Sequence, residues 1–519
     1  MKPNKRGTVY LVGAGPGAPD YLTLRAADLL GRADVVVYDN LVGEGILEHF
    51  APGARAVYVG KQAGRHTKSQ EEIGDLLVTL AGKHDAVVRL KGGDPYIFGR
   101  GAEEASVLRE AGVRFETVPG VTAAQGASAT AGIPLTHRET NASVTLVTGH
   151  EDPTKKASTL DYEALARCGA LVFYMGVGRL AAIASALVDR GLSPDTPAMI
   201  VRNATLSDQQ TVAGTVADIA RRASEAGIRP PALVFIGTTV SYQPALDWFS
   251  GRPLFGRAVV VTRARAQASV LSDRLRGLGA RVVEFPSIEI RPVAGKEREK
   301  IDRTARSLSR WDWIVFTSVN GVEIFRDRLL ALGLDARAFA GLRLVAIGPA
   351  TGERLETYGL RPDFLPSRYT SEALAAGLPA KVFAGAPRFL LARAREGNPQ
   401  LARDLRKRGA RVSELVLYDT VPARTPAGPV KKRLRDGTVD AVTFTSSSTV
   451  RYFQERVGPR NFKTFSKKTA YVSIGPVTSQ TIRDLGAEPA AEARTHTIPG
   501  LVQTLTDYFE DPARQANQK

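Results

Sequence analysis

The chain has 519 residues, of which 43% are hydrophobic and 24% charged, as in a globular protein of several domains. No apolar run approaches the roughly 18 residues of a membrane-spanning helix. A single cysteine, Cys168, excludes an intramolecular disulfide and a cysteine-based zinc site. We therefore expect a cytoplasmic protein that binds no metal and enters no membrane.

The net charge of +17 is unevenly distributed. Residues 1–250 carry 25 Lys and Arg against 26 Asp and Glu, a net charge of −1, whereas residues 251–519 carry 45 against 27, a net charge of +18. A Gly- and Pro-containing stretch near residue 250 marks the boundary, so we expect domains 1–250 and 251–519. The basic half could bind nucleic acid, bind a small polyanion, or carry solvated surface charge. It contains no nucleic-acid-binding motif and no aromatic residues interleaved with its arginines, which disfavours nucleic acid.

Both halves alternate short apolar runs with helical patterns. The runs are rich in Val and Ile, and each leads into a turn that contains glycine. Examples are residues 8–12, 86–90, 144–148, 258–262 and 441–445. Strands that crossover helices bury on both faces have this appearance, so the fold class is predicted to be α/β.

Three loops at strand ends indicate a ligand site in the first half. Residues 13–18 match G-x-G-x-x-A, and Asp39 ends the next strand, so a nicotinamide-dependent oxidoreductase is one alternative. Pro16 disfavours it, because proline removes a backbone N–H that a pyrophosphate would use. Residues 91–101, with paired glycines and Asp94, and residues 118–124 form the other two loops. Paired glycines allow a ligand to approach the backbone closely.

The motifs of the first half also resemble a known family. They include V-G-A-G-P-G, V-V-V-Y-D-N-L-V, R-L-K-G-G-D-P-Y-I-F-G-R-G, V-P-G-V-T-A-A, G-I-P-L-T-H-R and V-F-Y-M-G-V. Together they resemble the uroporphyrinogen-III C-methyltransferases of the tetrapyrrole methylase family over residues 7–250. The resemblance implies a two-lobed α/β methylase fold and S-adenosylmethionine as methyl donor. It also implies two C-methylations of uroporphyrinogen III to precorrin-2, for siroheme or cobalamin, and a homodimer formed through this half.

The same resemblance implies roles for individual residues. Asp39 matches the family's proton acceptor and Lys61 its proton donor; the alternatives are that Asp39 caps a helix and that Lys61 is a solvated charge. Ala204 stands where relatives often carry glycine. The matches to cofactor-binding positions are Pro16, Gly92, Gly93, Asp94, Ile97, Thr122, Ala123, Met175 and Ala204.

The second half contains an internal duplication. Residues 316–321 and 444–449 both begin with F-T-S, and residues 346–351 and 473–478 share I-G-P-x-T, the first preceded by Ala and the second by Ser. A duplication of this kind predicts two similar α/β lobes that face a shared cleft. Hydroxyl groups and backbone N–H groups at helix starts would bind anions there.

These repeats resemble uroporphyrinogen-III synthase over residues 256–506. The resemblance implies one lobe from residues 256–289 and 421–506 and another from residues 290–420. It also implies cyclisation of hydroxymethylbilane with inversion of the last ring. A tetrapyrrole polycarboxylate would account for the basic charge of this half. Tyr418 matches a family tyrosine that could protonate the leaving hydroxide, and the candidate substrate contacts are Thr351, Thr478, Ser318, Ser446 and Arg393.

The two resemblances support each other, because the product of the second activity is the substrate of the first. The sequence therefore predicts a bifunctional enzyme with small-molecule tetrapyrrole substrates. The alternative is a methyltransferase whose C-terminal half only binds tetrapyrroles. Retention of Tyr418 and Thr351 argues against that alternative.

Overall fold

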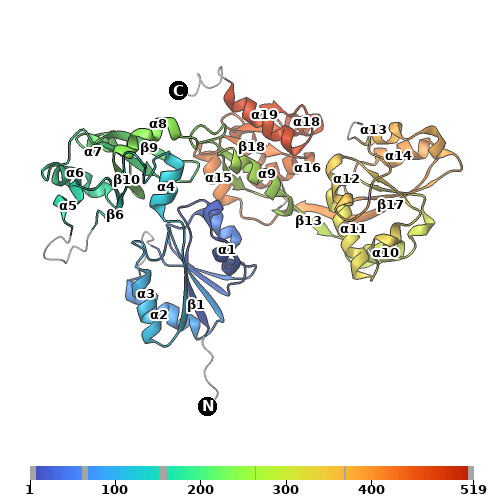
Figure 1. Ribbon diagram of the computed structural model, residues 1–519. Helices are drawn as coiled ribbons and strands as arrows, with labels where there is room; N and C mark the ends of the chain where they lie inside the picture. Colours follow the sequence, from blue (N-terminus) through green and yellow to red (C-terminus); the bar gives the residue numbers. More distant parts are fainter. Residues whose placement is uncertain (1–6, 61–67, 151–159, 264, 368–369, 512–519) are drawn as a thin grey trace, which may run out of the picture. The chain divides into compact units, whose positions relative to one another are not determined.

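The computed structural model describes residues 7–60, 68–150, 160–263, 265–367 and 370–511, and Lys61 lies outside these residues. The chain divides into two units. The first comprises Met1–Arg257 and Leu275–Arg281, and the second comprises Ala258–Arg274 and Val282–Lys519. Four five-stranded sheets with flanking helices make up the two units, which confirms the predicted α/β class (Figure 1).

The first sheet of the first unit is parallel throughout, with the order β3-β2-β4-β1-β5. Its strands are β1 (Thr8–Gly13), β2 (Val35–Tyr38), β3 (Arg55–Tyr58), β4 (Ala86–Lys91) and β5 (Arg114–Val118). Helices α2 (Gln70–Ala81) and α3 (Gly101–Glu110) pack on one face, and α1 (Leu24–Leu30) packs on the other. Because the strands are parallel, their carboxyl ends share one edge, where ligands of such sheets bind.

The second sheet of this unit is mixed, with the order β6-β7-β10-β8-β9. Its strands are β6 (Val144–Thr148), β7 (Ala170–Tyr174), β8 (Pro197–Arg202), β9 (Gln210–Thr215) and β10 (Ala232–Gly237). Strands β7 and β8 run in the same direction because both are antiparallel to β10. The helices are α4 (Ala123–Ala131), α5 (Tyr162–Ala166), α6 (Leu180–Val188), α7 (Ile219–Glu225) and α8 (Gln243–Leu246). Helix α4 covers one face, and α5, α6 and α7 cover the other.

One lobe of the second unit has the strand order β12-β11-β18-β19-β20. Its strands are β11 (Ala258–Val261), β12 (Arg281–Glu284), β18 (Ala441–Phe444), β19 (Ala470–Ser473) and β20 (Ala491–Glu492). Its helices are α9 (Arg265–Gly277), α15 (Gly428–Arg435), α16 (Ser447–Val457), α17 (Pro459–Phe465), α18 (Pro476–Asp484) and α19 (Ile498–Glu510).

The other lobe has the strand order β13-β17-β16-β14-β15. Its strands are β13 (Ile288–Pro292), β14 (Trp313–Phe316), β15 (Arg343–Ala346), β16 (Arg388–Ala394) and β17 (Arg411–Pro422). Its helices are α10 (Gly295–Ala305), α11 (Val319–Ala331), α12 (Pro349–Glu356), α13 (Ser371–Gly377) and α14 (Gln400–Lys407).

Strands β13 and β17 carry the chain between the two lobes. They are antiparallel, with Ile288 opposite Pro422 and Pro292 opposite Tyr418. The expected lobe boundaries, at residues 289 and 421, fall inside this pair of strands. The duplicated motifs occupy equivalent places, because each F-T-S ends a strand and supplies the serine that caps the next helix, Ser318 for α11 and Ser446 for α16.

Neither a membrane span nor a metal cluster is present in the described part of the chain. None of the helices there combines the length and the hydropathy that crossing a bilayer requires. The same residues contain no group of three or more His, Cys, Asp or Glu side chains that could hold a metal ion.

Candidate functional site

Three loops meet at the carboxyl edge of the first sheet. The N–H of Ala14 donates to the carbonyl of Lys91 at 2.7 Å, and Gly15 and Gly93 exchange backbone hydrogen bonds at 3.2 and 2.7 Å. A Cβ atom on Gly13 would lie 2.5 Å from the nitrogen of Gly120, and one on Gly120 would overlap the carbonyl of Gly93. Only glycine at these positions lets the loops after β1, β4 and β5 pack this closely.

The glycine loop after β1 differs from a dinucleotide-binding loop. It pairs with Gly93 rather than opening a helix, since the first α-helix begins only at Leu24. Strand β1 also lies between β4 and β5, whereas the dinucleotide fold has the order 3-2-1-4-5. Both observations disfavour the nicotinamide alternative.

Asp94 ties two of these loops together. Its Oδ2 accepts from the N–H of Gly120 at 3.0 Å, and its Oδ1 accepts from the N–H of Tyr96 at 2.8 Å. A carboxylate has about four lone-pair sites, so Asp94 can accept further hydrogen bonds from a ligand. Asp94 therefore shapes the site as well as offering it a negative charge.

Tyr174, at the end of β7, connects the second sheet to these loops. Its hydroxyl lies 2.6 Å from Thr122 Oγ1 and accepts from the N–H of Ala124 at 2.9 Å, both at the start of α4. Burial raises the pKa of Tyr174, and its hydrogen bonds lower it by less. Tyr174 is not among the site residues predicted from the sequence, although it precedes Met175 in the V-F-Y-M-G-V motif.

Unusual backbone conformations concentrate around the same loops. Outside glycine, positive φ angles in the described residues occur at Phe98, Arg100, Met175, Asn203, Thr205 and Ala386, and all but Ala386 lie in the first unit. Met175 has φ 55° and is 53% exposed. Strained residues of this kind cluster at ligand sites, where the surrounding structure holds them in place.

The predicted cofactor residues all follow the carboxyl ends of strands. Ile97, Ala123 and Ala204 belong to one apolar cluster with α4. Pro16 packs close to this helix, because a Cβ atom on Gly126 would lie 2.5 Å from the ring of Pro16. The structure thus brings together residues from five strand ends: Pro16 after β1, Gly92, Gly93, Asp94 and Ile97 after β4, Thr122 and Ala123 after β5, Met175 after β7 and Ala204 after β8.

Asp39 lies at the same edge, directly after β2. Its Oδ2 accepts from Arg89 Nη2 at 3.1 Å and its Oδ1 accepts from the N–H of Leu41 at 3.0 Å. The next helical turn begins at Glu44 and is capped by Gly43, so the alternative that Asp39 caps a helix is wrong. The other proposed proton-transfer residue, Lys61, lies outside the described residues.

A cleft of about 400 Å³ lies between the two lobes of the second unit. One lobe contributes Thr317, Arg393, Glu396, Tyr418 and Thr420 to its lining, and the other contributes Ser446, Ser447, Ser448 and Arg451. The cleft therefore brings together the predicted residues Tyr418, Arg393 and Ser446. Thr351 and Thr478 lie in the first turns of α12 and α18 and are each 4% exposed.

Tyr418 is held at the wall of this cleft. Its hydroxyl lies 2.8 Å from Ser318 Oγ, which also accepts from the N–H of Gly321 as the cap of α11. The pairing of β16 with β17 shifts between Arg393 and Ala394, and such bulges redirect side chains near active sites. Burial raises the pKa of Tyr418 above its ordinary value, and hydrogen bonds lower it by less. Tyr418 is therefore protonated at neutral pH.

Two arginines of the cleft have different surroundings. Arg393 is buried and donates to Glu414 at 2.8 Å and to the carbonyls of Ala394 and Gly397. Its donors are thus already engaged by the protein. Arg451, one turn after Ser447 on α16, is exposed, and no described carboxylate forms an ion pair with it. Residues four apart lie on the same face of a helix. Arg451 follows Ser447, in the duplicated serine motif, by four residues, and this spacing is the sequence signal that indicates Arg451.

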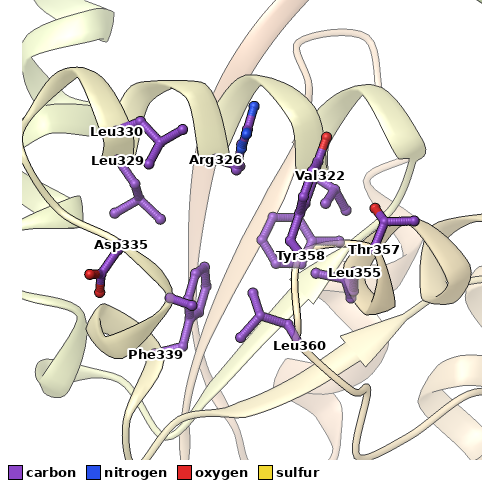
Figure 2. A pocket seen from close by; sticks show the side chains of 12 residues that line it. Val322, Arg326, Leu329, Leu330, Asp335, Phe339, Leu355, Thr357, Tyr358 and Leu360 are labelled. Carbon is purple, nitrogen blue, oxygen red and sulfur yellow. The ribbon is translucent and has the colours of Figure 1, made fainter.

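A smaller cavity of about 290 Å³ lies in the same lobe as Tyr418, between α11 and α12. Figure 2 shows that aliphatic and aromatic side chains such as Leu329, Phe339 and Leu360 surround it. Arg326, the cation among its lining residues, stacks on the ring of Tyr358 at 4.7 Å. A polycarboxylate fits the polar cleft better than this apolar cavity.

Comparisons with known proteins agree with the two sites. Residues 8–220 match the family model of the Tetrapyrrole (Corrin/Porphyrin) Methylases, and residues 269–503 match that of Uroporphyrinogen-III synthase HemD. Porphyrin biosynthesis protein HemD of Ruminiclostridium josui is 37% identical over 449 residues, which cover 86% of this chain and 88% of that protein. The chain belongs to both families.

Two further proteins resemble the methylase half. The S-adenosyl-L-methionine-dependent uroporphyrinogen III methyltransferase of Methanosarcina barkeri is 49% identical over 235 residues, covering 45% of this chain and 92% of that protein. The uroporphyrin III C-methyltransferase structure from Thermus thermophilus is 43% identical, with a TM-score of 0.40, and covers 45% of this chain and 99% of that one. Both recognitions made from the sequence, a tetrapyrrole methylase followed by a uroporphyrinogen-III synthase, are confirmed. The roles of the individual residues stay predictions.

Proposed function

We propose that this chain is a bifunctional enzyme of tetrapyrrole biosynthesis. Its synthase half cyclises hydroxymethylbilane to uroporphyrinogen III, and its methylase half methylates that product twice to precorrin-2. The observation that carries the proposal is the presence of both families in one chain, because the product of one is the substrate of the other. A buried, protonated Tyr418 in the cleft favours an active synthase over a module that only binds tetrapyrroles.

The methyl donor is S-adenosylmethionine, which supplies a methyl group on a sulfonium. The Methanosarcina relative is named as dependent on it. The residues at the loop cluster fit this group, because the carboxylate of Asp94 can accept from hydroxyl or ammonium groups and Ile97 and Met175 offer apolar contact. We propose that the cofactor residues predicted from the sequence hold it there, and that the gain in rate comes mainly from orientation of the methyl donor against the substrate carbon.

Asp39 is proposed to take the proton that the methylated substrate carbon loses. Its side chain is 21% exposed, and its carboxylate keeps lone pairs that Arg89 and Leu41 do not use. A carboxylate is a suitable base for such a step. We retain Lys61 as the proposed proton donor from the family resemblance.

In the synthase half, Tyr418 is proposed to protonate the departing hydroxide. Ser446 and the start of α16 would bind substrate carboxylates through hydroxyl and N–H groups. Arg451 adds an exposed positive charge to the same wall of the cleft. Arg393 forms an ion pair with Glu414. This pair favours a role for Arg393 in shaping the loop after β16 over a direct contact with the substrate.

Incubation of the chain with hydroxymethylbilane tests this function. Without S-adenosylmethionine we expect uroporphyrinogen III, and with it we expect the dimethylated product. Hydroxymethylbilane also closes spontaneously to the uninverted isomer I. Isomer I as the sole cyclic product would contradict an active synthase, while methylation of supplied uroporphyrinogen III would still report on the methylase half.

Asp94→Ala is expected to weaken the binding of S-adenosylmethionine by about 1.5–3 kcal/mol, the scale of a lost charge-assisted hydrogen bond. The change also removes the bond that holds the loop after β5 to the loop after β4. Titration calorimetry measures the effect, and Asp75→Ala, an exposed position on α2, is the matched control. An unchanged dissociation constant would place the cofactor elsewhere.

We further propose a cytoplasmic homodimer that forms through the methylase half. The single cysteine favours a reducing compartment. Leu24 is 92% exposed, and Phe115, on the edge strand β5, is 37% exposed. Arg25 and Glu116, which follow Leu24 and Phe115 in the sequence, form an ion pair with a distance of 3.0 Å. The two apolar side chains therefore come from adjoining segments. Sedimentation of Leu24→Asp should show monomers where the unaltered chain shows dimers.

A further inference from the structure

A buried cluster of charged side chains lies next to Asp39 in the methylase half. Arg89 and Lys91 come from β4 and Glu104 comes from α3, and their side chains are 4%, 5% and 0% exposed. Gln70, from α2, donates to Glu104 Oε1 at 2.9 Å. Helices α2 and α3 lie side by side on the same face of the first sheet (Figure 1). The cluster therefore joins both helices to strand β4.

Glu104 is the centre of this cluster. Its Oε1 accepts from Arg89 Nε at 3.2 Å and from Lys91 Nζ at 2.8 Å. Burial raises the pKa of Glu104, but the positive charges of Arg89 and Lys91 and the hydrogen bonds from Lys91 and Gln70 together lower it by more, so the carboxyl is ionised. Burial and the charge of Arg89 together lower the pKa of Lys91. With Asp39 included, the cluster contains two cations and two carboxylates, so its net charge is zero.

Arg89 connects this centre with the proposed base. While its Nε donates to Glu104, its Nη2 donates to Asp39 Oδ2 at 3.1 Å and its Nη1 donates to the carbonyl of Leu90 at 2.9 Å. A guanidinium is planar and rigid. Fixing Nε at Glu104 therefore fixes the direction in which Nη2 points, and with it the place of the Asp39 carboxylate.

The cluster is costly for the stability of the fold. Burying charges removes their hydration, and apolar residues of similar volume often stabilise a core better. Glu104 Oε2 adds to this cost, because it is buried without a hydrogen-bond partner in the described part of the chain. Among its carboxylates only Asp39 reaches solvent, with a side chain that is 21% exposed. This arrangement points to a role at Asp39 rather than in stability.

We propose that Glu104 is a positioning residue for the methylation, which it serves by setting the orientation and the electrostatic surroundings of Asp39 through Arg89. The inference rests on the proposed function, in which Asp39 takes a proton from the substrate. Glu104 itself is fully buried, and its Oε1 accepts hydrogen bonds from Gln70, Arg89 and Lys91. Without the negative charge of Glu104, Asp39 is the one carboxylate left in the cluster to face the two cations Arg89 and Lys91.

Glu104→Gln in the full-length chain tests this proposal, because it keeps the shape of the side chain and removes its charge. We expect kcat for methylation to fall by up to about 100-fold, while KM for S-adenosylmethionine stays unchanged. Glu110→Gln, at an exposed position on the same helix, should leave both kcat and KM unchanged.

A double variant, Glu104→Gln with Lys91→Met, guards against a loss of folding, because it preserves the net charge of the cluster. It should unfold at a higher temperature than the single variant while kcat stays lowered. Folded variants with unaltered kcat for methylation would overturn the proposal. Asp39→Asn in the same assay separates the two ideas. If it methylates at full rate, Asp39 is not the base; if it is inactive while Glu104→Gln is fully active, only the role of Glu104 is wrong.

Discussion

Replacing Asp39 with asparagine is expected to lower kcat for methylation by about 10²–10⁴-fold, the range of general base catalysis. Asparagine keeps the size of the side chain and can still accept a hydrogen bond from Arg89, so the local structure should persist. It cannot take the proton that the substrate carbon must lose. The binding of S-adenosylmethionine should be unaffected, since Asp39 lies after β2 and the predicted cofactor residues follow other strands.

The measurement is the initial rate of precorrin-2 formation from supplied uroporphyrinogen III at saturating cofactor. Asp28→Asn is a suitable control, because Asp28 is exposed on α1 and pairs with the surface residues Arg25 and Arg32. The rate of cyclisation should be the same in both variants. A normal methylation rate in Asp39→Asn would leave Asp39 as a binding residue and require another base.

Replacing Tyr418 with phenylalanine is expected to lower kcat for cyclisation by about 10²-fold, at the lower end of general acid catalysis, because hydroxide loss needs only a weak acid. The affinity for hydroxymethylbilane should change little, since the ring still fills its buried place at the wall of the cleft. The fraction of isomer I should rise, because spontaneous closure then competes with the slowed enzyme. Tyr358→Phe, beside the apolar cavity of the same lobe, is the matched control.

The pH dependence of cyclisation provides a second test of Tyr418. Burial raises the pKa of this phenol above its ordinary value of 10.0, so the group keeps its proton through neutral and moderately alkaline pH. The acid form should therefore be lost only when the pH exceeds the ordinary tyrosine range. A fall in kcat near neutral pH that persists in Tyr418→Phe would assign the titration to another group. Added salt should raise KM without imitating the tyrosine variant, because screening acts on charge pairs.

Patterns along the chain were sufficient to predict much of this protein. Strand runs that end in glycine loops identified the carboxyl edge of the first sheet, because parallel buried strands have a recognisable composition. The repeats at residues 316–321 and 444–449 identified two related lobes, since equivalent strand–turn–helix units need the same residues. Asp94 is predicted as a site residue from its glycine-containing loop at a strand end and from the methylase resemblance, whereas Tyr418 is predicted from the resemblance to the synthase family alone.

Only the tertiary structure decided how the charged side chains are paired. Arg89 reaches Glu104 across 15 residues of sequence and Asp39 across 50, through the packing of α3 on β4 and the order of the strands. Arg393 was predicted to hold substrate, yet its guanidinium bonds to Glu414 on the neighbouring strand. Local patterns determine which segments form strands and helices. The partner of a buried charge depends on strand order, register and bulges, which only the assembled sheets determine.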